Sequence, residues 1–186
     1  MSEALRIDPV SLEEFEAMSF GRRKAELIDG MIVLAHAFPT PRHARITAGV
    51  ATAFNIALRA AQKPCRAEVG GGLSVRRDND NQLGPDVLVT CGGGRDEAGA
   101  PILAVEVLSP SNTMTEMERK LTAYRAHPDL RHLLLLRQND YRAEHWMRGP
   151  DGRWHADLLE GADAVLDIPD VGGSWTLAEL YGDVFN

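Results

Sequence analysis

The sequence has little cysteine and no long apolar run. The first feature argues against a structural zinc site, and the second argues against a membrane-spanning protein. Only Cys65 and Cys91 are present, far apart and without CxxC or Cys/His spacing, which argues against a structural zinc site. Two free thiols in a reducing compartment are expected instead. No apolar run approaches the roughly 20 residues that span a bilayer, and the first ten residues are polar and mixed in charge, unlike a signal peptide. We therefore expect a cytoplasmic protein with no membrane partner.

Basic residues are scarcer than acidic residues. Lys and Arg number 20 against 27 for Asp and Glu, and the net charge is −7. This argues against a general nucleic-acid coating protein, because phosphate contacts favour basic surfaces. A local basic cleft is still compatible with it, and its candidate residues lie at 22–24, 42 and 45, 76–77 and 119–120.

Length and composition are those of an ordinary globular protein. The chain has 186 residues, of which 44% are hydrophobic and 25% charged, and this length predicts a single domain over residues 1–186. Ser11 and Glu14 match a capping box that predicts a short helix over 11–18. Asp29-Gly30 between two apolar runs predicts a hairpin.

Helical and extended patterns then alternate along the chain. Apolar residues at helical spacing predict long helices over 42–62 and 113–126. The other expected elements are strands at 86–90, 102–108 and 132–136, a meander at 144–147, 154–158 and 164–168, and a short helix at 175–180. We predict an α/β or α+β fold, with a sheet flanked by helices and an antiparallel β-meander at the C-terminal side.

One charged residue interrupts an apolar segment. Glu106 is the only charge in the run Ile102–Leu108, whose pattern is typical of a buried strand. An ionised carboxylate left unpaired in an apolar interior is very costly. Glu106 must therefore have a partner such as Arg119 or Arg125, hold a metal, or lie at an opening of the sheet.

The loop before this strand predicts a neighbour for Glu106. The loop runs from 91 to 101 and is centred on residue 96. If the two flanking strands form an antiparallel hairpin about that centre, Asp86 lies directly opposite Glu106, with Cβ atoms about 5 Å apart. Two such carboxylates repel unless a cation lies between them, and Mg²⁺ binds carboxylate oxygens while keeping several waters. A slip of one residue would put the two groups on opposite faces.

Lys120 in the second long helix is a candidate third member of this site. It flanks the apolar stripe that contains Leu121 and Tyr124, so its stem can be buried while the ammonium reaches over the sheet. An ammonium near a metal can stabilise phosphate charge or orient an attacking water. The alternative from spacing alone is a surface bridge to Glu116, four residues earlier.

These residues belong to a longer pattern along the chain. It consists of ELIDG at 26–30, PRH at 41–43, PDV at 85–87, VEVLSPS at 105–111, and then Lys120 and Tyr124. From about residue 11 to the end, the sequence resembles the Uma-two-type restriction endonucleases, a branch of the PD-(D/E)XK nuclease superfamily. The stretch at 105–111 followed by a helical lysine is the most specific part of the resemblance.

The resemblance implies a restriction-endonuclease-like mixed sheet and a metal-dependent nuclease core. Asp86 and Glu106 would be the metal ligands, together with the carbonyl of Val107. Leu108 stands where the superfamily pattern has lysine, and Lys120 is similar to the migrated lysine of this branch. The resemblance further implies roles near the site for Glu26 and His43, although His43 is equally explained as an ordinary polar residue at a helix start.

We hypothesise an endonuclease that cleaves DNA with Mg²⁺, or with Mn²⁺, and that forms a homodimer or a higher homo-oligomer. Its candidate catalytic residues are Asp86, Glu106, Lys120 and Glu26, and its candidate substrate-binding residues are His43 and Arg42. An alternative from another class is a nuclease-like scaffold that binds nucleic acid or a protein partner without cutting, which the acidic balance favours. A third reading is a purely structural oligomerising domain.

Overall fold

The computed structural model describes residues 9–21, 23–34, 39–76, 80–94, 99–109 and 114–185. Several residues of the patterns above lie outside these ranges. They are Arg22, Arg77, Pro110 and Ser111, together with residues 95–98 of the loop before Glu106.

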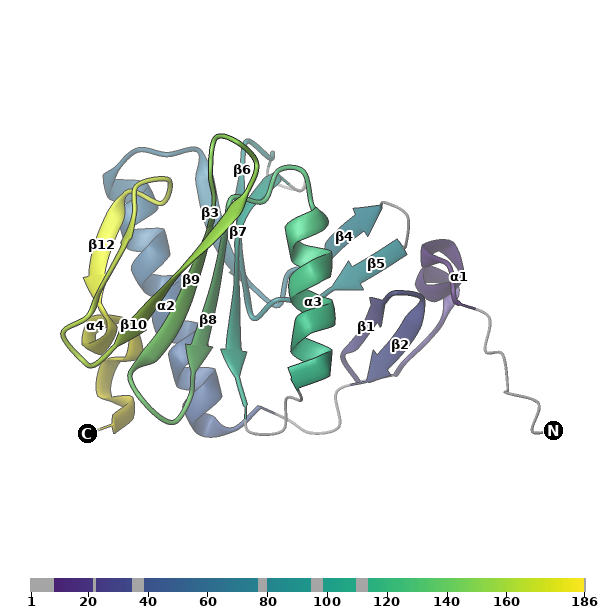
Figure 1. Cartoon of the computed structure of the whole chain (residues 1–186), viewed down its shortest axis with the longest axis horizontal. Helices are drawn as coiled ribbons and strands as arrows, with labels where there is room; N and C mark the ends of the chain where they lie inside the picture. The colour runs from purple at the N-terminus through teal and green to yellow at the C-terminus, as the bar shows by residue number, and fades with distance from the viewer. Residues whose placement is uncertain are drawn as a thin grey trace.

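A six-stranded mixed sheet forms the centre of the molecule, in the order β10-β9-β8-β7-β6-β3 (Figure 1). Its strands are β3 (Cys65–Val69), β6 (Val87–Cys91), β7 (Ala100–Leu108), β8 (His132–Arg137), β9 (Arg142–Arg148) and β10 (Trp154–Glu160). Only β7 and β8 run parallel among these neighbours, because α3 (Met114–Ala126) carries the chain back between them. The predicted mixed sheet is confirmed. Of the predicted meander, β9 and β10 pair antiparallel, whereas the strand expected at 164–168 lies in a separate two-stranded sheet.

Helices cover both faces of this sheet. Helix α2 (Pro41–Ala60) packs on one face and α3 on the other (Figure 1). Strand β8 shows why both faces are apolar, since Leu134 and Leu136 join the core under α2 whereas Leu133 and Leu135 join the core under α3. In the described ranges, none of the helices is long and apolar enough to span a membrane.

A second sheet of four strands lies beyond α3, in the order β2-β1-β5-β4 (Figure 1). Its strands are β1 (Ala25–Ile28), β2 (Met31–Leu34), β4 (Leu73–Arg76) and β5 (Asp80–Leu83). The predicted hairpin joins β1 to β2, with Asp29 and Gly30 at φ of 50° and 72°, the positive values that such a two-residue turn requires. Helix α1 (Leu12–Ala17) precedes it and begins with the predicted Ser11–Glu14 capping box.

The C-terminal segment packs against α2. It consists of the paired strands β11 (Val165–Ile168) and β12 (Gly173–Thr176), helix α4 (Leu177–Tyr181) and the 3-10 turn η1 (Gly182–Phe185). The expected helix over 175–180 begins later, because Thr176 is its N-cap and forms a capping box with Glu179.

The two cysteines are paired, and the expectation of two free thiols was wrong. Cys65 on β3 is the register partner of Cys91 on β6, with 3.9 Å between their Cα atoms, and the two form a disulfide. They are 26 positions apart in the sequence, and only the pairing of β3 with β6 brings them together.

Candidate functional site

Asp86 and Glu106 lie beside each other at one end of the β6–β7 pair. Strand β6 begins at Val87, whose register partner on β7 is Val105. The Asp86 N–H also donates to the Val105 carbonyl, over 2.9 Å, and the Val107 N–H donates to Asp86 Oδ2 over 2.8 Å. Asp86 and Val87 thus both lie against Val105, and the direct pairing of Asp86 with Glu106 that the loop symmetry predicts is not among the register pairs of β6 and β7.

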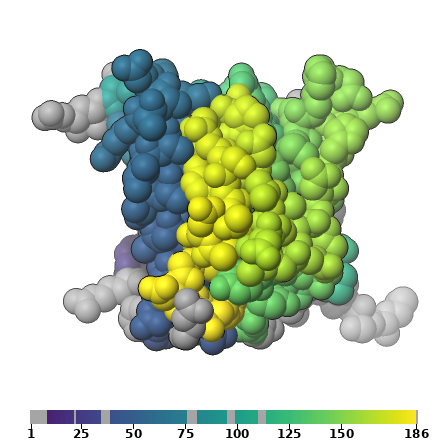
Figure 2. Space-filling view, turned by 90° about the vertical axis from the view of Figure 1, so that its left-hand side faces the viewer, coloured from purple at the N-terminus to yellow at the C-terminus, as the bar shows by residue number. Residues whose placement is uncertain are grey.

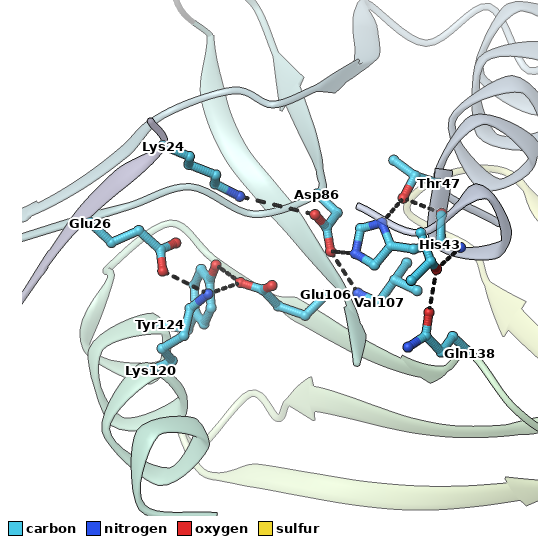
Figure 3. Close-up of polar contacts among 11 residues, drawn as sticks. Lys24, Glu26, His43, Thr47, Asp86, Glu106, Val107, Lys120, Tyr124 and Gln138 are labelled. Carbon is cyan, nitrogen blue, oxygen red and sulfur yellow. Dashed lines mark hydrogen bonds and ion pairs between the residues drawn. The ribbon is translucent and has the colours of Figure 1, made fainter. Parts of the chain in front are cut away.

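Lys120 bridges two buried carboxylates that come from different sheets (Figure 3). Its Nζ lies 2.8 Å from Oε1 of Glu106 on β7 and 3.0 Å from Oε2 of Glu26 on β1. The lysine is only 5% exposed. Burial alone would lower the pKa of Lys120, but the charges of Glu106 and Glu26 raise it above its ordinary value. Lys120 is therefore a charged, buried residue, and the partner of Glu106 is this lysine and not an arginine.

Tyr124 lies one turn further along α3 and donates its hydroxyl hydrogen to Oε1 of Glu106. Burial raises the pKa of the Tyr124 phenol well above its ordinary value, and the charges of Glu106 and Glu26 add to this effect. The side chain therefore acts as a donor. Sequence reasoning placed Tyr124 in an apolar stripe and missed this bond. The signal was its spacing, because residues four apart on a helix face the same way.

Glu106 is in an environment with an excess of negative charge. Burial raises the pKa of its carboxyl group, the charge of Lys120 opposes this, and the charges of Asp86 and Glu26 raise it again, so that the pKa is raised overall. Both donors to Glu106 use Oε1. Among the described residues no hydrogen bond or ion pair reaches Oε2, which leaves one carboxylate oxygen for a further cation or donor.

His43 holds the other side of Asp86. Its Nε2 lies 3.2 Å from Asp86 Oδ2, as Figure 3 shows. Burial alone would raise the pKa of Asp86, but the hydrogen bond and charge of His43 lower it, with help from the Val107 N–H and from Lys24, and the pKa is lowered overall. Asp86 is therefore a carboxylate at neutral pH.

Thr40 at the N-cap of α2, Thr47 on α2 and Gln138 just after β8 fix the position of His43. The helix begins after Thr40, whose hydroxyl accepts from the His43 N–H over 3.1 Å and donates to Gln138 Oε1 over 2.9 Å. One turn later, the Thr47 hydroxyl donates to the His43 carbonyl over 2.9 Å and lies 3.5 Å from its Nδ1. Sequence reasoning did not identify Thr47 or Gln138, which no motif marked.

Gly84, in the loop between β5 and β6, leaves space for Lys24 and holds Glu26 by a backbone hydrogen bond. The Gly84 N–H donates to Oε1 of Glu26 over 2.7 Å, and a Cβ at Gly84 would lie 2.6 Å from Cε of Lys24, so a larger residue would displace the lysine. Lys24 Nζ lies 4.0 Å from Oδ1 of Asp86, and its side chain is 45% exposed. Lys24 was noted only as part of a basic stretch, although its position two residues before Glu26 could have indicated a shared side of the strand.

The predicted site residues thus converge, with one exception. Glu26, His43, Asp86, Glu106 and Lys120 meet at one place, as does the backbone of Val107. The side chain of Arg42 instead donates to Asn139 Oδ1 over 3.3 Å and packs with its Cζ 5.4 Å from the centre of the Phe185 ring. Within the described ranges no group of three or more His, Cys, Asp or Glu side chains is arranged to hold a metal ion.

Other proteins are similar to this chain in sequence and in fold. The sequence model of the Uma2 family, described as putative restriction endonuclease, matches residues 12–179. The uncharacterized protein slr1290 of Synechocystis sp. is 29% identical over 167 residues, which cover 86% of this chain and 84% of that protein. A second uncharacterized protein of that organism, sll1609, is 36% identical over 68 residues, covering 37% of this chain and 38% of its own.

A solved structure confirms the fold class. The crystal structure of a putative nuclease belonging to DUF820, from Anabaena variabilis, superposes with a TM-score of 0.76 and 17% sequence identity. The superposition covers 95% of this chain and 100% of that one. Since the family match extends over nearly the whole chain, the protein belongs to the Uma2 family of putative restriction endonucleases.

Proposed function

We propose that this protein is a metal-dependent endonuclease that hydrolyses phosphodiester bonds in DNA. The observation that carries the proposal is the convergence of Asp86, Glu106 and Lys120, with two acidic side chains close enough to interact at one end of the β6–β7 pair and a buried lysine beside them. Membership of the Uma2 family supports the nuclease assignment. Cleavage of both strands of a duplex favours a homodimer or a higher homo-oligomer.

The ligands we assign to the metal are carboxylate oxygens of Asp86 and Glu106 and the carbonyl of Val107. In a strand the N–H and C=O of one residue point to the same edge, so the Val107 carbonyl points toward the side where its N–H meets Asp86. Such an all-oxygen set suits Mg²⁺ and also Mn²⁺.

The side chains around these ligands have distinct tasks. When bound, a divalent metal would polarise the scissile phosphate and lower the pKa of a bound water. Lys120 supplies a permanent positive charge for the phosphate and the attacking water, and Glu26 holds its ammonium in place. Tyr124 fixes the orientation of Glu106 by binding Oε1. We assign His43, which lies against Asp86, to contacts with the substrate.

A second candidate function is a nuclease-like scaffold that binds nucleic acid or a protein without cutting. It is favoured by the net charge of −7 and by the lack of a three-residue metal group in the described part of the chain. Calorimetric titration with Mg²⁺ and Mn²⁺ distinguishes the two. Heat of binding at millimolar metal supports the endonuclease, and no uptake by the wild type supports the scaffold.

Replacing Glu106 by glutamine tests the endonuclease. Glu106→Gln keeps the shape and loses the charge, so plasmid cleavage with Mg²⁺ should fall more than about 100-fold, since even outer partners of metal sites contribute 10- to 100-fold. The thermal unfolding midpoint checks that the chain still folds. Glu13→Gln makes the same change at an exposed position and should cleave normally. Wild-type cleavage by Glu106→Gln would refute the assignment.

A further inference from the structure

Strand β10 is an unusually open edge of the central sheet. It is the end strand in the sheet order, and its seven residues pair with β9 in one continuous register without a shift. Natural proteins blunt such edges with proline, lysine or a bulge, or cover them with another segment. Residues 154–160 contain no proline and no lysine, and the described part of the chain places no strand against their outer side.

Strand β3, at the opposite edge, is protected in a way that β10 is not. The side-chain amide of Asn55 on α2 donates to the Ala67 carbonyl over 2.8 Å and accepts from the Ala67 N–H over 3.0 Å. The outward backbone groups at the middle of β3 are thus capped from within the chain.

The side chains of β10 are exposed where those of an inner strand would be buried. His155, Ala156, Asp157 and Leu158 are all exposed, and Leu158 keeps 52% of its surface accessible. In Figure 2 the light-green part of the chain that contains β10 forms the right-hand margin of the face shown. A further strand could therefore be added to the sheet there.

The sequence of β10 is complementary to itself in one antiparallel register. If two copies pair about a two-fold axis at Ala156, His155 of each copy faces Asp157 of the other. In the same register, Trp154 of each copy faces Leu158 of the other. An imidazole N–H can donate to a carboxylate, and apolar pairs directly across two strands stabilise a sheet. Every such pair occurs twice because the axis is two-fold.

Two other registers lack this match. An axis at Asp157 would bring the two Asp157 side chains face to face, and like charges in that position are destabilising. An axis at Leu158 would pair Asp157 with Leu159 and Ala156 with Glu160, with no opposite charges across the two strands. The axis at Ala156 gives favourable partners on both the polar face and the apolar face of the strand.

We propose that a second copy of this chain binds along β10, antiparallel and with its two-fold axis at Ala156, so that the two central sheets become one. The proposal goes beyond the nuclease function and does not depend on it. Cleavage is measured with the plasmid assay and dimerisation by light scattering, so the failure of one can be distinguished from the failure of the other.

Oligomeric state is the first test. By size-exclusion chromatography with light scattering, the wild type should have twice the 20.4 kDa mass of one chain, and Leu158→Lys should shift it to the monomer because lysine protects edge strands. The matched control is Ile56→Lys, which adds the same charge at another exposed apolar residue, 63% accessible on α2, and should stay a dimer. A monomeric wild type, or a dimer that persists in Leu158→Lys, overturns the proposal.

Cross-linking tests the register and does not require that the interface be broken. Ala156→Cys brings two thiols to facing positions, where Cα atoms about 4.5–5.5 Å apart permit a disulfide. Mild oxidation should convert it to a covalent dimer on non-reducing gels. Glu160→Cys, whose two copies would lie about 27 Å apart in this register, should stay monomeric on the same gel, as should the wild type. Equal cross-linking of both variants, or of neither, overturns the register.

Discussion

Two polar clusters of this protein differ in whether the charges and hydrogen bonds within each cluster balance one another. The first consists of Glu26, Asp86 and Glu106 with their cationic partners. The buried ammonium of Lys120 pairs with both Glu26 and Glu106, whereas Asp86 is held by His43 at 3.2 Å and by the half-exposed Lys24 at 4.0 Å. The consequence is visible in Glu106, whose pKa is raised by burial and by its acidic neighbours despite Lys120.

The second cluster consists of His132, His145 and Asp170. Nδ1 of His132 lies 3.1 Å from Nε2 of His145, and Nε2 of His132 lies 3.0 Å from Oδ2 of Asp170. Burial lowers the pKa of both imidazoles, that of His145 to about 4. Both rings are therefore neutral at pH 7, and a neutral ring can donate at one nitrogen and accept at the other.

This difference in charge balance indicates which of the two clusters has a functional role. The histidine cluster is complete without any added group, so it is explained by the stability of the fold. The carboxylate cluster keeps like charges together, which burial penalises and which a bound cation would relieve. Stability measurements can therefore test the contrast without any assay of activity.

The largest expected effect comes from removing the buried ammonium. Lys120→Met leaves Glu26 and Glu106 buried without their shared cation, and breaking a buried ion pair on one side costs about 3–5 kcal/mol. The free energy of unfolding, measured with urea, should fall by this amount. Lys120→Arg keeps the charge and should lose less. A loss below about 1 kcal/mol in Lys120→Met would mean that the cluster behaves like a surface ion pair.

Acid should weaken the histidine cluster. The pKa of His145 is lowered in the fold from 6.5 to about 4, so between these values the unfolded chain binds the proton more readily. This contribution to stability is complete above pH 6.5 and is lost as the pH falls toward 4, to an extent on the order of 3 kcal/mol. Urea unfolding of the wild type and of His145→Gln across this range measures it. Equal pH slopes in the two proteins would contradict the explanation.

Two tyrosines allow a finer comparison of charged and neutral acceptors. Tyr124 donates to the carboxylate of Glu106, whereas Tyr181 donates to the Arg142 carbonyl over 2.9 Å. Hydrogen bonds to charged groups contribute about 1.5–3 kcal/mol, and neutral ones about 0.5–1.5 kcal/mol. Tyr124→Phe should therefore lower the free energy of unfolding more than Tyr181→Phe does. The opposite order would argue that Lys120 already satisfies Oε1 of Glu106.

Local pairing explains which parts of the site were predictable from the sequence. The hairpin of β6 and β7 is closed by one loop, so the loop centre was enough to place Asp86 and Glu106 at the same end of this strand pair. The position of Lys120 beside Glu26 depends on a helix and a second sheet, and only the family resemblance suggested it. Spacing along the chain carries no information on such distant contacts.

Two features were not predicted from the sequence. One depends on the pairing of distant segments, and the other lacks an apolar pattern. The disulfide of Cys65 and Cys91 depends on the pairing of two strands that are separated in the sequence. Strand β5 has the sequence DNQL, in which Asn81 is buried because its side chain accepts from the Asp29 N–H over 2.9 Å. A strand whose inward residue is polar shows no alternation of apolar and polar residues.

The smallest expected effect concerns Lys24, the second lysine of the carboxylate cluster. Its Nζ is 4.0 Å from Asp86 and its side chain is 45% exposed, against 6% for the Lys120 side chain, so water screens its charge. Lys24→Met should change the free energy of unfolding by less than about 0.5 kcal/mol. Because Lys24 helps to lower the pKa of Asp86, the acidic limb of a cleavage pH profile should move to slightly higher pH. A stability loss as large as that of Lys120→Met would show that the difference in exposure between the two lysines does not determine how much each contributes to stability.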